Sequence, residues 1–162
     1  MTLAEFTCPG LIVPRLLGND ATTVIQELSL SLRRENRVPD LLRFYHAVLN
    51  REFLVSSDWE TGLAFPHARL PELNQLSLAL GRSDKPIVWN TRSLRPVQLV
   101  FLIAVPEDSI QYLSLVAGIV RLSKEKSLLE RLRTAQDSVG MLEVLRKIKL
   151  SGEPKPIIKS TR

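Results

Sequence analysis

An uninterrupted apolar stretch, Leu99–Val105, constrains the fold more than any other feature of the sequence. It is far shorter than the ~20 residues that a membrane-spanning helix needs. A strand buried on both faces has no side that requires polar residues, so a short continuous apolar run is typical of the centre of a sheet. We therefore expect a central buried strand over Val97–Val105.

Apolar residues at helical spacing occur both before and after this strand. Asp20 is a suitable N-cap for the first helix, and Pro39 suits the first position of the second. Asp108 or Ser109 is the expected cap of the third. The predicted helices cover residues 20–33, a segment that begins at Pro39, and residues 109–123, 126–135 and 138–150.

Shorter apolar runs predict the remaining strands. Leu76–Leu80 alternates leucine with small residues, which is the period of a half-buried strand, and Gly81–Asp84 is expected to form a turn after it. The other predicted strands are Leu11–Val13, Phe53–Val55, Gly62–Phe65 and Ile87–Trp89. Helices before and after a cluster of strands predict a layered α/β domain.

The length of 162 residues and the hydrophobic content of 44% fit a single globular domain. We expect this domain over residues 1–150 and a basic flexible tail over 151–162. The net charge is +5, but outside the tail cations alternate with acids, as in RRENRVPDLLR. Because no basic stripe emerges, we predict no nucleic-acid partner.

The N-terminus lacks the basic start and continuous apolar core of a secretory signal. Together with the absence of any run long enough to span a bilayer, this predicts a cytoplasmic protein with no direct membrane insertion. Cys8 is the single cysteine, so the fold cannot depend on an internal disulfide.

The segment Thr61–Arg69, TGLAFPHAR, contains the strongest candidate for chemistry. Pro66 fixes its own φ and donates no N–H, so we expect the preceding strand to end there and to leave His67 at its rim. An imidazole titrates near neutrality, and its neutral form offers a nitrogen lone pair as a base, a metal ligand or a phosphoryl acceptor.

Four motifs in a fixed order carry a resemblance to a known family. They are Arg51–Ser57 with its RE and paired serines, Gly62–Arg69 with GLAFPHAR, the apolar run Pro96–Pro106, and Leu113–Ala117. This series, over roughly residues 13–147, resembles the enzyme IIA domain of the bacterial sugar phosphotransferase system, fructose/mannitol type, which includes the nitrogen-regulatory proteins.

The resemblance implies a single three-layer domain whose mixed sheet is flanked by helices on both faces. It also implies that His67 accepts a phosphoryl group from a phosphohistidine on the small carrier protein HPr, without a cofactor. Within the family, a free-standing regulatory protein of the nitrogen type is preferred over a sugar-specific component of a fructose/mannitol permease. Further partners are then a regulatory target protein or a separately encoded membrane permease component.

The same resemblance assigns roles to other residues. Arg51 stands at the family's arginine position, where a guanidinium can hold phosphoryl oxygens with two hydrogen bonds or form an ion pair beneath the site. Arg69 is expected to face a partner. The predicted auxiliary phosphoryl-binding residues are Ser56, Ser57, Ser109 and Gln111.

Three positions depart from the family pattern and keep a second hypothesis open. Asp58 and Glu60 stand where the family usually has glycines, and Ser109 stands where it commonly has a second histidine. Carboxylates near a phosphoryl group repel it. The alternative is therefore a degenerate enzyme IIA-like module that binds a regulatory target without being phosphorylated.

Other kinds of chemistry find little support in the sequence. His46, His67 and Cys8 are scattered along the chain, so no metal site is predicted, and no motif supports a thiol catalytic pair. The chain contains no glycine-rich phosphate loop, which argues against direct nucleotide chemistry.

Overall fold

One sheet forms the middle layer of the computed structural model, which describes residues 1–59 and 61–151. Its strands run in the order β1-β5-β6-β3-β2, with β4 also paired to β6. The bounds are β1 (Ile12–Val13), β2 (Asp58–Trp59), β3 (Leu63–Ala64), β4 (His67–Leu70), β5 (Ser77–Val88) and β6 (Pro96–Pro106).

The sheet is mixed, as predicted. β5 and β6 form a long antiparallel pair, while β1 lies parallel to β5, and β3 and β4 lie parallel to β6. β3 and β4 meet β6 in one unbroken register, since Leu63 pairs with Leu99 and His67 pairs with Ile103. They therefore behave as one strand interrupted at Pro66, in which β4 lies at the edge of the sheet and β3 is paired on its outer side with β2.

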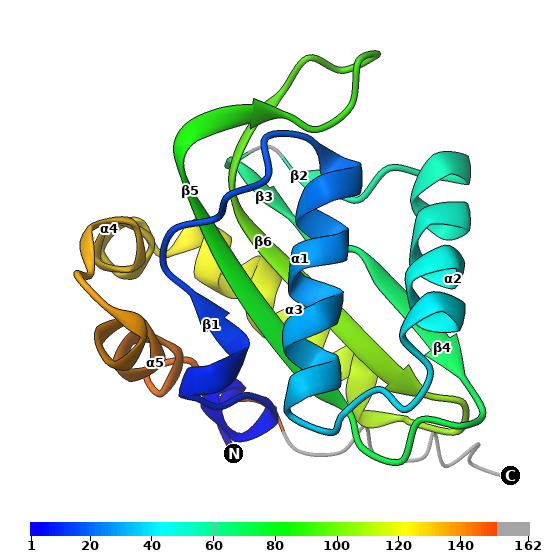
Figure 1. Ribbon diagram of the computed structural model, residues 1–162. Coiled ribbons are helices and arrows are strands. Elements are labelled where there is room, and N and C mark those ends of the chain that lie inside the picture. Colours follow the sequence, from blue (N-terminus) through cyan, green and yellow to red (C-terminus); the bar gives the residue numbers. More distant parts are fainter. Residues whose placement is uncertain (60, 152–162) are drawn as a thin grey trace, which may run out of the picture.

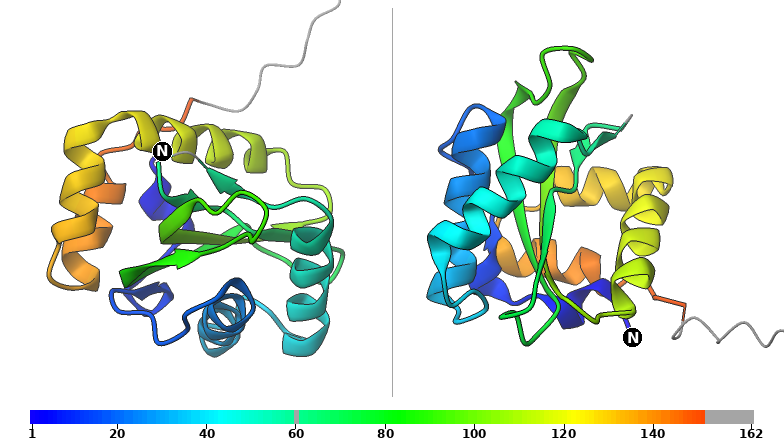
Figure 2. Two further views of the ribbon diagram at one scale, coloured as in Figure 1. Left: turned by 90° about the horizontal axis from the view of Figure 1, so that it is seen from above. Right: turned by 90° about the vertical axis from the view of Figure 1, so that its right-hand side faces the viewer.

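Helices cover both faces of this sheet (Figures 1 and 2). On one face lie α1 (Ala21–Arg34) and α2 (Leu41–Leu54), and on the other lie α3 (Gln111–Lys124), α4 (Lys126–Thr134) and α5 (Ser138–Leu145). Short 3-10 turns at Leu3–Phe6 and Pro9–Leu11 precede β1. The predicted three-layer α/β architecture is confirmed.

Successive residues of β6 point into two separate cores. Phe101 and Ile103 join the cluster beneath α3–α5, whereas Val100 and Leu102 join the cluster beneath α1 and α2. All four side chains are fully buried. A strand packed on both faces has no polar side, and this is the physical reason for the uninterrupted apolar run.

Two predicted elements are wrong. Phe53 and Leu54 form the last turn of α2 rather than a strand, because no breaker follows Arg51 and the Val55 N–H still donates to the Arg51 carbonyl. The segment Gly81–Asp84 lies within β5 rather than in a turn. Gly81 pairs with Val100, and the strand is irregular only between Arg82 and Ile87.

Several helix ends differ from the prediction. α2 begins at Leu41 after the N-cap Asp40, whose side chain accepts from the Arg43 N–H, so Pro39 lies before the helix. α3 begins at Gln111 after Ile110, with no side-chain cap. α5 ends at Leu145 rather than near Leu150.

The predicted tail over residues 151–162 lies, apart from Ser151, outside the described residues. Within the described part of the chain, no helix has the length and apolar character needed to cross a membrane.

Candidate functional site

A cavity of about 390 Å³ opens at the edge of the sheet formed by β4. Its walls come from three elements that are far apart in the sequence, namely α2, β4 and the first turn of α3. The lining residues are Ala47, Arg51, His67, Ala68, Arg69 and Tyr112. Two arginines and one histidine thus share one small, partly enclosed space.

His67 opens β4 instead of lying at a strand rim, which corrects the sequence prediction. β3 does end before Pro66, as expected from a residue without an N–H. The Pro66 carbonyl nevertheless accepts a hydrogen bond from the Ile103 N–H at 2.9 Å, so the register continues across the interruption. His67 therefore sits along the sheet edge, where its backbone is anchored to the central strand.

The two nitrogens of the His67 ring are in different environments. Nδ1 is buried and has no hydrogen bond of regular geometry within the described part of the chain. Burial of the ring is the largest cause that holds the pKa of His67 below its ordinary value of 6.5. A contact with the Phe65 backbone raises the pKa in part, while the charges of Arg51 and Arg69 lower it further. The ring is therefore neutral at pH 7.

Arg51 and Arg69 come to the cavity from different elements, α2 and β4. Arg51 lies in the last turn of α2 with an exposed side chain, and it is in none of the ion pairs found among the described residues, so the predicted ion pair beneath the site is absent there. Arg69 is tethered, because its Nη1 donates to the backbone oxygens of Pro106, Glu107 and Ser109 at 2.9–3.2 Å.

Tyr112 is a residue of the cavity that the sequence reasoning missed. Its ring centroid lies 5.2 Å from that of His67, and the Arg69 guanidinium carbon lies 5.4 Å from its ring centroid, within the range of a cation–π contact. Burial raises the pKa of the Tyr112 hydroxyl more than the two arginine charges lower it, so the hydroxyl remains a donor at neutral pH. The sequence signal that could have identified Tyr112 was its position three residues after Ser109, on the first turn of the third helix.

Ser56 and Ser57 donate hydrogen bonds to nearby carboxylates and take no part in the His67 cavity. The Ser56 hydroxyl donates to Asp58 at 2.6 Å, and both the N–H and the hydroxyl of Ser57 donate to Glu52. Glu52 also accepts from Trp89 Nε1 at 2.5 Å. Neither serine lines the His67 cavity.

The Asp58 carboxylate is likewise held within its own loop. Burial alone would raise its pKa, but hydrogen bonds from Ser56 and Ser93 and the charge of Arg95 together hold the pKa below 3.8. Asp58 does not line the His67 cavity. Glu60, the second carboxylate of this loop, lies outside the described residues.

Ser109 and Gln111 line a different cavity, which also contains Asn74 and Asp108. Only the backbone oxygen of Ser109 reaches the His67 region, as an acceptor from Arg69. The structure thus brings together Arg51, His67 and Arg69 from the predicted set and leaves the four auxiliary residues apart.

Metal and thiol chemistry gain no support from the geometry. No group of three or more potential metal-ligating side chains occurs within residues 1–59 and 61–151. The Cys8 thiol donates to Glu35 at 3.5 Å, and His46 is exposed on α2.

Sequence comparison identifies a family that spans most of the chain. Residues 5–148 match the family described as "Phosphoenolpyruvate-dependent sugar phosphotransferase system, EIIA 2". A nitrogen regulatory protein of Bradyrhizobium diazoefficiens is 30% identical over 151 residues, which cover 90% of this chain and 95% of that relative.

Solved structures have the same fold. The nitrogen regulatory protein IIA-Ntr of Neisseria meningitidis superposes with a TM-score of 0.76 at 24% identity, covering 88% of this chain and 98% of the other. The Escherichia coli enzyme IIAMTL, solved in complex with phosphorylated enzyme IIBMTL, gives a TM-score of 0.73 at 16% identity over 86% of this chain and 96% of the other.

Proposed function

Because the chain belongs to the EIIA 2 family of the phosphoenolpyruvate-dependent sugar phosphotransferase system, we propose that it is a phosphocarrier that accepts a phosphoryl group on His67. The observation that carries this proposal is a neutral imidazole in a cavity with two arginines. We assign the role to the domain formed by residues 1–150.

In the transfer, a His67 ring nitrogen attacks the phosphorus of a phosphohistidine on an HPr-type carrier. The new nitrogen–phosphorus bond forms as the carrier's bond breaks, and the bonding electron pair returns to the carrier's imidazole. Since Nδ1 is buried, Nε2 is the nitrogen that we assign as the acceptor. A lowered pKa favours the reaction because only the neutral ring has a free lone pair.

Arg51, Arg69 and Tyr112 stabilise the transferred group. Charge spread over the phosphoryl oxygens requires positioned donors rather than further covalent chemistry. Arg69 is held by three backbone carbonyls, so its charge is in place before the partner arrives. Arg51 has an exposed side chain and no ion pair among the described residues, so it can turn toward the phosphoryl oxygens. The protonated Tyr112 hydroxyl adds a neutral donor.

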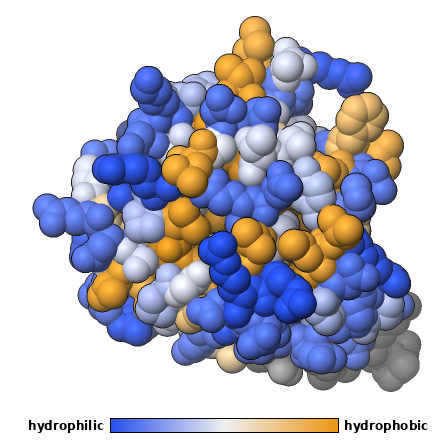
Figure 3. Space-filling model, viewed as in Figure 1, coloured by the Kyte–Doolittle hydropathy of each residue, from blue (hydrophilic) through white to orange (hydrophobic). Residues whose placement is uncertain are grey.

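Exposed apolar side chains on the two helices that contribute to the cavity suit a protein partner. Phe53, Leu54 and Val55, at and just after the end of α2, are 92%, 78% and 61% exposed. Apolar side chains are visible at the upper right of Figure 3, where Figure 1 places the end of α2. Ile110 and Leu113, at the start of α3, are 57% and 65% exposed. These exposed apolar side chains could contact apolar residues of an HPr-type carrier, and the cationic cavity suits the phosphoryl group that the carrier delivers.

Identity to a nitrogen regulatory protein favours a regulatory role over sugar transport. In this role the phosphorylation state of His67 controls binding of a target protein. A mannitol enzyme IIA has been solved in complex with a phosphorylated IIB partner, which supports a second protein as a partner of this chain.

The test is incubation of the purified chain with phosphorylated HPr. We expect an adduct that is labile in acid and stable in base, detected by mass spectrometry and 31P NMR, and we expect His67→Ala to abolish it. His46→Ala is the matched control, because that ring is exposed on α2 and outside the cavity, and it should be labelled like the wild type.

An unmodified wild-type chain, under conditions that label an established enzyme IIA, would select the non-phosphorylated binding module instead. The geometry of Asp58 weakens one argument for that alternative, since its carboxylate is bound by Ser56 and Ser93 and lies outside the cavity. Ser109, at the position of the family's second histidine, lines another cavity, whereas Tyr112 lines the His67 cavity. Tyr112 is therefore the better residue at which to test for an auxiliary group that assists phosphorylation. Tyr112→Phe should slow phosphorylation, and Ser109→Ala should leave it unchanged.

A further inference from the structure

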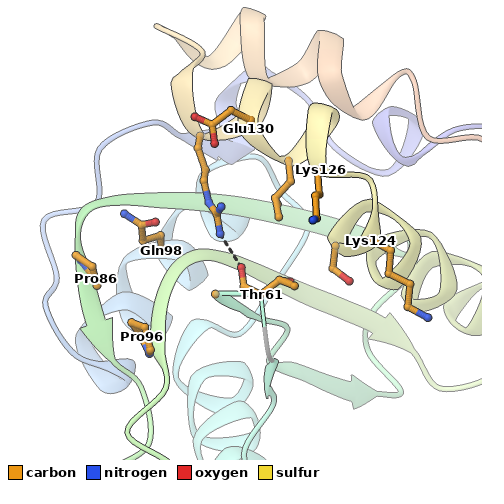
Figure 4. A pocket seen from close by; sticks show the side chains of 11 residues that line it. Thr61, Pro86, Pro96, Gln98, Lys124, Lys126 and Glu130 are labelled. Carbon is orange, nitrogen blue, oxygen red and sulfur yellow. Dashed lines mark hydrogen bonds between the residues drawn. The ribbon is translucent and has the colours of Figure 1, made fainter.

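A second and larger cavity, of about 770 Å³, lies at the opposite end of α3 from Tyr112 (Figure 4). It is bounded by the Thr61–Gly62 turn, the ends of β5 and β6 near Pro86 and Pro96, the last residues of α3, and one face of α4. Its volume is in the range of pockets that hold small molecules. The two cavities share no lining residue.

One face of α4 brings mixed chemistry to this cavity. Lys126, Leu129, Glu130 and Arg133 follow the spacing that places residues on one side of a helix. Lys124, at the end of α3, adds another ammonium group. The described lining thus carries three cations against one carboxylate, together with apolar surface from Leu129 and the two prolines.

The polar end of the cavity has unmet hydrogen-bonding capacity. Arg133 Nη2 donates to the Thr61 backbone oxygen at 2.7 Å, the dashed line in Figure 4. Arg133 Nε and Thr61 Oγ1 are both buried and have no hydrogen-bond partner within the described part of the chain. Unpaired buried donors are costly, so a ligand with acceptor oxygens would relieve this end of the cavity if a small movement of the Arg133 and Thr61 side chains turned these donors toward it.

The backbone at Gly62 keeps the guanidinium close to the turn. Its φ is +84°, and a Cβ at this position would lie 3.2 Å from Arg133 Nη2. Glycine therefore allows both the turn and the close approach of the arginine.

From these features we propose that the cavity binds a small organic anion, a carboxylate or phosphate monoester with an apolar portion. The acidic group lies toward Lys126, Arg133 and the Thr61 hydroxyl, and the apolar portion lies against Leu129, Pro86 and Pro96. The site is separate from His67 and does not depend on phosphoryl transfer.

The first experiment is an NMR titration of the unphosphorylated chain, without any carrier protein, with four probes. Phenyl phosphate and 3-phenylpropionate combine an anion with a ring, whereas inorganic phosphate lacks the ring and benzyl alcohol lacks the charge. With phenyl phosphate, 3-phenylpropionate or both, we expect chemical-shift changes at the amides of Thr61, Gly62, Lys124, Lys126 and Arg133. Which of these two probes binds shows whether the site takes a phosphate or a carboxylate. The other two probes should bind at least about tenfold more weakly, which corresponds to about 1.4 kcal/mol.

Equal binding of benzyl alcohol, or shifts confined to the residues around His67, would overturn the proposal. The second outcome would assign anion binding to the Arg51–Arg69 cavity instead. Because no carrier is present, neither result bears on whether His67 is phosphorylated.

Charge variants test the same site with substitutions that the fold can tolerate. Lys124, Lys126 and Glu130 are exposed. The double variant Lys124→Gln/Lys126→Gln should weaken binding by about three- to tenfold, within the range of exposed charge interactions, and Glu130→Gln should strengthen it. Lys147→Gln, an exposed lysine outside the cavity, is the matched control and should bind like the wild type. Unchanged binding in the double variant would contradict the proposal.

Discussion

At the scale of the residue, the environment of His67 has a consequence for stability as well as for chemistry. Burial and the charges of Arg51 and Arg69 hold the pKa of the folded ring below 6.5, and Tyr112 packs against it without adding charge at neutral pH. In the unfolded chain the ring regains its ordinary pKa. Between these two values the unfolded chain binds more protons than the folded protein.

The free energy of unfolding should therefore be greatest above pH 6.5 and should fall as the pH is lowered through 6.5 toward the folded pKa of His67. The His67→Gln variant lacks this titrating group. Its free energy of unfolding should therefore fall less between pH 7.5 and 5.5 than that of the wild type. Urea denaturation at several pH values measures the difference. His46→Gln, on the exposed face of α2, should keep the decline of the wild type. An equal decline in wild type and His67→Gln would contradict the buried environment of this ring.

At the scale of the element, the interrupted strand β3–β4 determines where the candidate site lies. The Gly62 carbonyl accepts from the N–H groups of Gln98 and Leu99, and the Pro66 carbonyl accepts from Ile103, so the strand is tied to β6 on both sides of the interruption. Gly62 has a positive φ of +84° directly before this strand. Non-glycine residues adopt such a conformation only at a cost.

Gly62→Ala should destabilise the protein by about 1–2 kcal/mol, the usual cost of a left-handed conformation, with a further contribution from the crowded Arg133 guanidinium. Gly62→Asn should cost less, since asparagine tolerates positive φ better than alanine does. The midpoint of urea denaturation provides the measurement. If alanine proved no worse than asparagine, the turn at Gly62 would not be strained.

At the scale of the whole molecule, β6, like β5 and β3, contributes residues to two separate cores on the two faces of the sheet. Phe101 packs beneath α3–α5 and Leu102 beneath α1 and α2, both fully buried. The His67 cavity lies where these two layers meet at the edge of the sheet, with Arg51 supplied by one layer and Tyr112 by the other. Its geometry therefore depends on both helical layers being docked together.

Phe101→Ala should cost about 3–5 kcal/mol and Leu102→Ala about 2–5 kcal/mol, because each leaves a cavity in a close-packed core. If the layers fold as one unit, each variant should still unfold in a single transition, with circular dichroism and tryptophan fluorescence coinciding. Val139→Ala, 56% exposed on α5, should change stability by less than about 0.5 kcal/mol. Separate transitions for the two probes would show that the layers are independent.

The sequence by itself determined the class of fold and the candidate for the reacting residue. A continuous apolar run requires burial on both faces, helical spacing requires amphipathic helices, and a Pro-His step after a short strand directed attention to His67. These are local patterns, and the energy behind them is local or depends only on burial. The same patterns failed where a local preference competed with a longer element, as at Phe53–Val55 in α2 and Gly81–Asp84 in β5.

Only the tertiary structure decided what surrounds His67. Docking of α2 and α3 at one edge of the sheet brings Arg51 and Tyr112 to the ring. Arg69 finds its backbone acceptors at the last residue of β6 and in the loop that follows. The four serine and glutamine residues nominated from the resemblance are directed elsewhere, since Glu52 and Asp58 compete for the two serines and Ser109 and Gln111 line another cavity. Such contacts join residues tens of positions apart, and their geometry is set by packing, which no spacing along a single chain encodes.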